Sequence, residues 1–183
     1  MMRNRTQFGQ RVLALLLAAV LLFAAVPAGT FRADAESVES DALSFSGFDA
    51  DLTGWVVSAD VGTDGSLTWE DGTASLKTEE SYGMETEKLI AVNPTGTYSL
   101  SYTASLSEGG ELSAYIYYYT LEGYTSDMPF VRLDGLLTTA ADRKTCSSDF
   151  SVPAGTYQVA VRFVLRSQTG GEVTARLDDV AVT

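Results

Sequence analysis

Histidine is absent from this sequence, and cysteine occurs once, at position 146. Without histidine the chain excludes a Ser-His-Asp triad, a Cys-His dyad and any metal site that needs an imidazole ligand. One cysteine excludes an intrachain disulfide, and a reactive thiolate would need a strongly cationic setting. Arg143 and Lys144 give Cys146 a single neighbouring basic pair. We therefore interpret Cys146 as a small, partly buried strand residue.

Basic residues are also scarce, with 12 Lys and Arg against 24 Asp and Glu. Residues 1–35 hold four of the arginines and one aspartate, so residues 36–183 carry 8 bases and 23 acids, a net charge of −15. An acidic surface of this kind repels nucleic acid and anionic lipid. It favours neutral ligands, cations or basic proteins, and we expect no nucleic-acid partner.

One long apolar run is present, from Val12 to Val26 near the N-terminus. Arginines precede it, and Ala33-Asp34-Ala35 follows it as a small-x-small site. This order is typical of a secretory signal peptide, whereas a membrane span needs about 20 apolar residues. We therefore predict a signal peptide over residues 1–35, a secreted protein and a mature form outside the membrane. An uncleaved N-terminal anchor is the alternative, and a cut after Ala28 would move the mature start.

Residues 36–183 show no sustained helical period, and apolar and polar residues alternate in short segments between Gly, Pro, Asn and Asp turns. A period of two is typical of half-buried strands, and many short strands in one domain indicate two packed sheets. We predict an all-β fold, a two-sheet antiparallel β-sandwich or jelly roll, with one domain over residues 36–183. The expected strands are 42–48, 54–59, 66–70, 73–78, 88–92, 97–106, 112–120, 130–133, 136–142, 145–152, 156–165 and 172–183.

Five motifs follow one another in a recognisable order along this domain. They are the Gly-Phe-Asp and Gly-Trp opening at 46–55, Asn-Pro-Thr-Gly before Thr-Tyr-Ser-Leu at 93–102, the tyrosines of 115–119, Val-Pro-Ala-Gly-Thr at 152–156 and Leu-Asp-Asp-Val at 177–182. Together they resemble carbohydrate-binding modules with the galactose-binding-like jelly roll, over about residues 42–183. The resemblance implies the sandwich fold and a polysaccharide or oligosaccharide partner. The opening acid here is Asp49, where that family pattern has Glu.

The tyrosine-rich segment is the main candidate binding surface. Tyr115, Tyr117 and Tyr119 alternate with Ala114, Ile116 and Tyr118, so they project from one face of a strand. If Ala114 and Ile116 face the core, the three tyrosines lie on the opposite surface, where aromatic rings stack on the apolar faces of sugars. The alternative is that these tyrosines fill the core or stabilise the sheet through cross-strand pairs.

Further aromatic residues extend this hypothesis. We assign Trp69, near the hairpin tip at Asp71-Gly72, and Tyr124, in a loop, to the same ligand-binding site. Tyr82 is also expected in a loop and could line the cleft. A core position is the alternative for Trp69, and Trp55, after the opening turn, is expected to anchor the core.

The resemblance also implies one structural Ca²⁺ between the first and the last strand, with Asp49 and Asp178 at the matching positions. Calcium requires six to eight oxygen ligands, which an acidic chain supplies readily. The alternative is that both are ordinary solvated carboxylates.

No pair of carboxylates is marked as catalytic, although the chain holds enough acids for some pair to reach the separation that glycoside hydrolysis needs by chance. We therefore predict a secreted, non-catalytic carbohydrate-binding module that recognises a glycan by aromatic stacking. An extracellular adhesion or assembly β-sandwich that binds protein is the alternative, and a small glycoside-active enzyme is a third hypothesis.

Overall fold

A computed structural model describes residues 48, 50–122, 130–133 and 142–183. These residues form eleven strands and no helix. None of their segments is therefore a helix that could cross a membrane. The strands are β1 Trp55–Val57, β2 Gly65–Glu70, β3 Thr73–Thr78, β4 Ser81–Thr86, β5 Ile90–Ala91, β6 Thr97–Leu106, β7 Gly110–Tyr119, β8 Phe130–Arg132, β9 Lys144–Ser151, β10 Gln158–Ser167 and β11 Val173–Val182.

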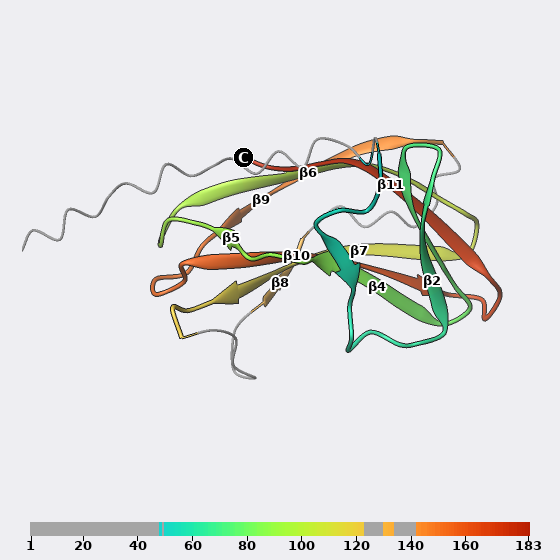
Figure 1. Ribbon diagram of the computed structural model, residues 1–183, viewed down its shortest axis with the longest axis horizontal. Helices are drawn as coiled ribbons and strands as arrows, with labels where there is room; N and C mark the ends of the chain where they lie inside the picture. The colour runs from blue at the N-terminus through green and yellow to red at the C-terminus, as the bar shows by residue number, and fades with distance from the viewer. Residues whose placement is uncertain (1–47, 49, 123–129, 134–141) are drawn as a thin grey trace, which may run out of the picture. The chain divides into compact units, whose positions relative to one another are not determined.

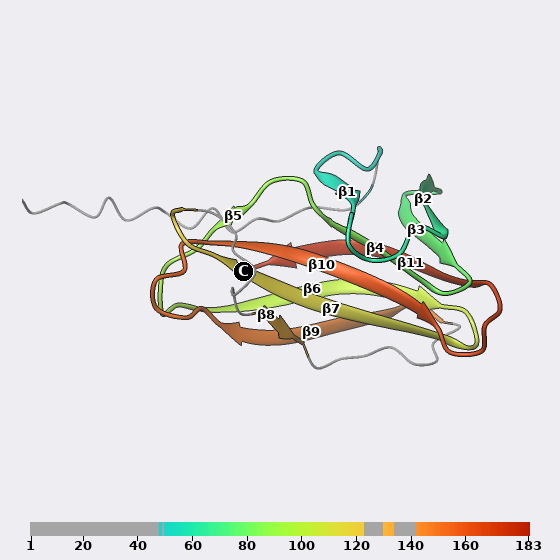
Figure 2. The same cartoon turned by 90° about the horizontal axis from the view of Figure 1, so that it is seen from below.

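The strands form two antiparallel sheets. One sheet has the order β1-β4-β10-β7-β8, with β5 pairing β10, and the other has the order β2-β3-β11-β6-β9. Figure 1 shows β6, β9 and β11 in one layer and β10, β7 and β8 in the other, and Figure 2 shows the same two layers from below. The two-sheet antiparallel sandwich that the sequence predicts is confirmed.

The last two strands lie in the middle of the two sheets. β10 lies between β4 and β7, and β11 lies between β3 and β6. Several consecutive strands belong to different sheets: β3 and β4, β6 and β7, and β10 and β11. Most pairings therefore join segments that are far apart in the sequence.

The core lies between the sheets and is built by the period of two. Along β10, the side chains of Val159, Val161, Phe163 and Leu165 are fully buried and face the other sheet. Phe163 lies with its ring centroid 5.8 Å from that of Trp55 and 4.9 Å from that of Tyr102. Trp55 is therefore the core anchor that the sequence predicts.

Strand β4 is the element that the sequence analysis missed. It runs through the segment in which Tyr82 was expected to be a loop residue, and the Tyr82 side chain is buried in the core beside Met84. Tyr82 therefore lies in a strand, on the inner face of the sheet, and not in a loop, which corrects that expectation. The expected bounds of β3 and β6 agree with the structure. The signal peptide and nearly all of the expected strands 42–48 and 136–142 lie outside the described residues.

Candidate functional site

The three tyrosines of β7 point away from the core. Leu112, Ala114, Ile116 and Tyr118 fill the inner positions, while Tyr115, Tyr117 and Tyr119 occupy the outer face of the β1-β4-β10-β7-β8 sheet. Although Tyr115 lies on the outer face, it is only 9% exposed, because neighbouring side chains on that face cover it. The sequence thus predicts which side of the strand carries the tyrosines.

A three-layer stack crosses this outer face. The Arg162 guanidinium lies over the Tyr117 ring, with Cζ 4.2 Å from the ring centroid. Phe130 stacks on Tyr117 with the centroids 5.3 Å apart and the planes at 21°. Since β10 and β8 flank β7 on opposite sides, Arg162 and Phe130 cover the two faces of the Tyr117 ring. Tyr117 is therefore the middle layer, and the outermost ring is Phe130, which is 56% exposed.

Ion pairs fix Arg162 in this stack. Its Nε donates to Glu85 Oε2 at 2.8 Å, and its Nη1 donates to Asp60 Oδ2 and Tyr117 Oη, each at 3.0 Å. Burial works to lower the pKa of Arg162, but these partners outweigh it and the pKa is raised. For Asp60, burial works to raise the pKa, yet the bond and charge of Arg162 hold it below its ordinary value. Both groups are therefore charged across the physiological pH range.

A cleft of about 380 Å³ lies beside the stack. Tyr115, Tyr117 and Phe130 line one part of it. The other lining residues come from the segment after β1 (Asp60, Val61 and Gly62), from β4 (Ser81) and from β10 (Arg162, Val164 and Arg166). Gly62 has φ +60°, and a Cβ built on it would lie 2.2 Å from the backbone oxygen of Ser81. Only glycine lets the chain approach β4 this closely in that conformation.

Arg166 lines the same cleft from β10. Its Nη1 donates to Tyr115 Oη at 3.3 Å. Its cross-strand neighbour Glu111 is bound by other donors, since Arg132 Nη2 reaches Oε1 at 2.6 Å and Gln168 Nε2 reaches Oε2 at 2.7 Å. The cleft therefore combines aromatic rings, phenol hydroxyls and guanidinium donors.

The other predicted binding residues lie elsewhere or outside the described residues. Tyr119 occupies the same outer face further along β7, beyond the residues that line the cleft. Trp69 is 43% exposed but lies on β2 of the opposite sheet, and its indole N–H donates to the Phe48 carbonyl oxygen. Tyr124 lies outside the described residues. Sequence reasoning missed Phe130, Arg162 and Asp60, whose proximity depends on strand pairing.

Asp178, on β11, contacts the first described segment at Phe48. The contact is a hydrogen bond from a backbone N–H group. Its Oδ1 accepts from the Phe48 and Asp179 backbone N–H groups at 3.3 and 2.9 Å, and its Oδ2 pairs with Arg143. The described residues surround this carboxylate with donors and a cation, so they do not by themselves form a calcium site. Within the described segments no three acidic, cysteine or histidine side chains gather at a metal-binding spacing. Asp49 lies outside them, and calcium binding stays a prediction.

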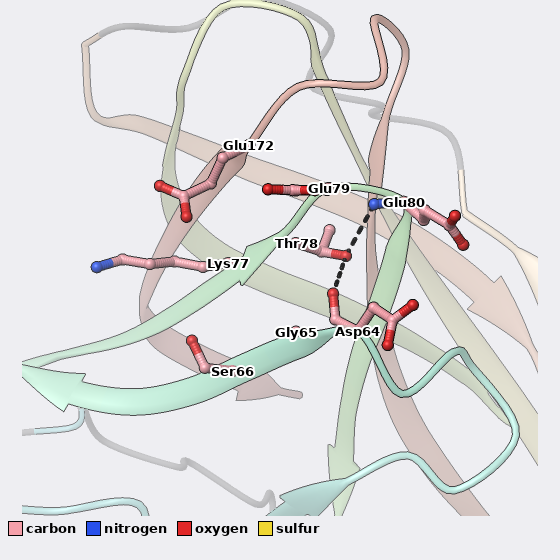
Figure 3. Close-up of a pocket in the computed structure, with 8 residues that line it drawn as sticks. All are labelled: Asp64, Gly65, Ser66, Lys77, Thr78, Glu79, Glu80 and Glu172. Atoms are coloured by element: carbon pink, nitrogen blue, oxygen red, sulfur yellow. Dashed lines mark hydrogen bonds between the residues drawn. The ribbon is translucent and has the colours of Figure 1, made fainter.

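A second hollow lies at one end of the β2-β3-β11-β6-β9 sheet. Asp64, Glu79, Glu80 and Glu172 line it together with Lys77. Figure 3 shows these carboxylates pointing in different directions, while Thr78 Oγ1 donates to the Asp64 carbonyl oxygen at 2.7 Å. Because the acids do not converge, this hollow has the features of a solvated acidic surface.

The outer face of the β2-β3-β11-β6-β9 sheet is rich in small hydroxyl residues. Its outward positions on β6 and β9 alternate with core residues and include Ser99, Ser101, Thr103, Ser105, Thr145 and Ser147. Some of them pair across strands, as Ser99 and Ser147 do with their Oγ atoms 3.1 Å apart.

Comparisons with known proteins show the fold. No family model matches the sequence, and no curated protein matches it. Among solved structures, a CBM4 carbohydrate-binding module superposes with a TM-score of 0.54 at 22% identity, covering 71% of this chain and 94% of that one. The N-terminal cellulose-binding domain of Cellulomonas fimi β-1,4-glucanase C superposes with a TM-score of 0.53 at 21% identity, covering 74% of this chain and 91% of that one.

A third similar structure is the CBM22-2 xylan-binding domain of Paenibacillus barcinonensis Xyn10C, with a TM-score of 0.54 at 16% identity, covering 75% of this chain and 96% of that one. At these identities the likeness shows the fold, and the fold is the jelly roll of carbohydrate-binding modules. The same fold serves different functions, and what a given protein binds depends on the residues of its site.

Proposed function

We propose that this chain is a secreted, non-catalytic module that binds a polysaccharide or oligosaccharide on the outer face of the β1-β4-β10-β7-β8 sheet. The observation that carries the proposal is the exposed ring of Phe130, held on Tyr117 and Arg162 beside an open cleft. Secretion is inferred from the signal-like segment at residues 1–35.

The chemistry of the cleft suits a sugar. The apolar C–H face of a pyranose ring packs on an aromatic face, and phenol hydroxyls bond the sugar hydroxyls. Phe130 offers the ring, since one of its faces rests on Tyr117 while more than half of the side chain stays exposed. A ring supported from below loses little conformational entropy when a ligand stacks on it.

The position of the tyrosines favours a glycan over a protein partner. Tyrosines buried between the sheets would favour an adhesion or structural role, whereas a polar-rimmed groove favours sugar. Tyr115 and Tyr117 lie outside the inter-sheet core and line a cleft with Asp60, Ser81 and Arg166. The cellulose-binding and xylan-binding domains that share the fold support the same choice.

The acid that lines the cleft, Asp60, argues against hydrolysis. A glycosidase acid has a raised pKa, so that it keeps a proton to donate. Asp60 has a lowered pKa, and it shares Arg162 with Glu85. A carboxylate held by a guanidinium is a poor proton donor, which supports a binding role.

The test compares two exposed aromatic residues on opposite sheets, Phe130 at 56% and Trp69 at 43% exposure. Phe130→Ala and Trp69→Ala are run through native gels that contain soluble polysaccharides such as β-glucans, xylans and galactans. We expect retention to fall at least tenfold for Phe130→Ala, which corresponds to about 1.4 kcal/mol. Trp69→Ala should be retarded by the polysaccharide as strongly as the parent protein is. Thermal melting checks that both variants are folded.

Opposite outcomes separate the hypotheses. Loss of retention in Trp69→Ala alone would place the ligand on the β2-β3-β11-β6-β9 sheet and contradict the proposed site. If no polysaccharide retards the parent protein, the glycan-binding proposal fails and the protein-binding alternative takes its place.

A further inference from the structure

Arg166 differs from every other described arginine in its pairing. Arg132 pairs with Glu111, Arg143 with Asp178 and Asp179, Arg162 with Asp60 and Glu85, and Arg176 with Glu70. Arg166 makes no ion pair within the described parts of the chain, although the protein has twice as many acids as bases. An arginine without a carboxylate is unexpected in so acidic a protein.

Glu111, the cross-strand neighbour of Arg166, and Asp60, which lines the same cleft, are already bound by other donors. Glu111 accepts from Arg132 and Gln168 on its two oxygens, and Asp60 and Glu85 both bind Arg162. Each of these bonds has a donor to oxygen distance of 3.0 Å or less. Neutralising Arg166 with any of these three carboxylates would therefore require one of these bonds to break.

The guanidinium of Arg166 is placed for a ligand. It lines the cleft that also contains Phe130, and its one described hydrogen bond goes to Tyr115 Oη at 3.3 Å. A guanidinium carries five N–H donors in a planar fork. Arg166 is partly exposed, and its Nε and Nη2 atoms make no hydrogen bond among the described residues, so they can bind a ligand.

We propose that the glycan carries an anionic substituent, a uronate carboxylate or a sulfate, which Arg166 binds. The assignment rests on the proposed glycan-binding function and names the class of glycan. Guanidinium matches a planar carboxylate in two parallel hydrogen bonds, and such charge-assisted bonds are stronger than bonds to neutral hydroxyls. Arg166 then gains a counter-ion, which none of the described carboxylates provides.

The overall charge of the protein points the other way, because a net charge of −15 over residues 36–183 favours neutral ligands. Distant charges are screened beyond roughly 10 Å at ordinary ionic strength, whereas a partly buried contact is screened much less. The charged residues lining the cleft are Arg162, Arg166 and Asp60, and Arg162 is already paired with both Asp60 and Glu85, so Arg166 is the lining charge without a described ion-pair partner. The charged residues of the cleft therefore decide whether an acidic or a neutral glycan is preferred, while the net negative charge of the protein slows the association of an acidic one.

The experiment measures affinity for matched pairs of polysaccharides. Uronate-rich polymers are compared with their carboxyl-reduced forms, and sulfated polymers with their desulfated forms, so that each pair differs only in the anionic group. We expect the purified protein to bind at least one acidic member about tenfold more tightly than its neutral partner. Arg166→Gln should bring the two affinities together, and Arg166→Lys should restore part of the preference.

Arg176→Gln is the matched control, because it removes one positive charge from the opposite sheet. It should keep the acidic preference. Equal or weaker binding of every acidic member overturns the anionic-ligand assignment while leaving glycan binding intact. A preference that Arg166→Gln and Arg176→Gln lose equally reflects net charge and also overturns it. Binding of no member of any pair contradicts the glycan-binding proposal itself.

Discussion

The two outer faces of the sandwich are built on the same alternation of side chains but differ in chemistry. On the β1-β4-β10-β7-β8 sheet the outward residues of three adjacent strands form the Arg162, Tyr117 and Phe130 stack. On the opposite sheet the outward residues of β6 and β9 are mostly serine and threonine. One face therefore has large side chains that support each other, and the other has small hydroxyls that bond to neighbours and water.

This difference teaches how a binding surface is recognised in an all-β domain. Large outward aromatics contribute little to the inter-sheet core, so they need another role or support from neighbours. Here ion pairs fix the lowest layer of the stack and leave the top ring exposed. The hydroxyl face has no comparable arrangement among the described residues.

The largest stability effect should follow loss of the guanidinium beneath the stack. Arg162→Met leaves Glu85 and Asp60 without their cation and removes the support of Tyr117. A broken buried ion pair costs ~3–5 kcal/mol, and the exposure of Asp60 reduces this to about 2–3 kcal/mol. Urea unfolding measures the change. Arg176→Met, which breaks an exposed pair on the hydroxyl face, should cost under about 1 kcal/mol.

Equal losses in the two variants would remove the distinction between the faces. In that case Arg162 would act as an ordinary surface residue, and the stack would not depend on its ion pairs.

Tyr117→Ala should affect both stability and binding. The ring touches Arg162 on one face and Phe130 on the other, so its loss removes packing as well as the support of the exposed ring. We expect a cost of about 2 kcal/mol, below the ~3–5 kcal/mol of a fully buried aromatic. Phe130→Ala should cost under about 1 kcal/mol while losing the same polysaccharide retention. Thermal melting and gel retardation of both variants measure the two effects. A Tyr117→Ala protein as stable as the parent would contradict the role of Tyr117 as the middle layer of the stack.

Gly62→Ala tests the wall of the cleft. The added Cβ would meet the Ser81 backbone oxygen at 2.2 Å, and the residue would be held at φ +60°. The left-handed conformation alone costs roughly 1–2 kcal/mol, and the clash adds to it. Gly170→Ala, at φ +74° with open space around it, carries the conformational cost alone. Chemical denaturation should therefore show a larger loss for Gly62→Ala, and equal losses would mean that the approach to β4 is not tight.

Calcium binding is tested by thermal melting with Ca²⁺ and with chelator. If Asp49 and Asp178 hold the ion, calcium stabilises the folded state by mass action and the melting temperature rises by a few degrees. The ion would compete with Arg143 for the Asp178 carboxylate. Coincident melting curves would exclude the site, and a shift that Asp178→Asn leaves unchanged would place it elsewhere.

The smallest effect is expected on the hydroxyl face. Ser101→Ala and Ser147→Ala remove outward hydroxyls from β6 and β9, which belong to the sheet opposite the cleft. Exposed substitutions of this kind stay within about 0.5 kcal/mol of the parent. Polysaccharide retention should be unchanged in both variants. Loss of retention would show that the serine and threonine face takes part in binding.

The fold was predictable because its signal is local. Alternation marks both faces of β6, β7 and β10, and turn residues mark their ends. β4 escaped because Glu79, Glu80 and Gly83 suggest a loop, although Tyr82, Met84 and Thr86 keep the period of two. Its strand character depends on pairing with β10, which lies about 80 residues further along the chain.

The site was only partly predictable because its geometry is non-local. The alternation of β7 identified Tyr115 and Tyr117 on one face, and the structure brings both to the cleft. That Tyr117 is covered on both sides follows from neighbours 13 and 45 residues away, Phe130 and Arg162. No local pattern distinguishes Arg162 from an ordinary outward strand residue, and none indicates that Trp69 belongs to the other sheet.

The central position of β10 and β11 also determines when the two faces come into existence. Each sheet lacks its middle strand until residues 158–183 have been synthesised, because β4 and β7 meet only through β10, and β3 and β6 only through β11. Folding dominated by such distant pairings is slow, in the range of milliseconds to seconds. Pairs such as β2-β3 and β6-β9 can form earlier, but neither sheet is continuous in a nascent chain until β10 and β11 have been made.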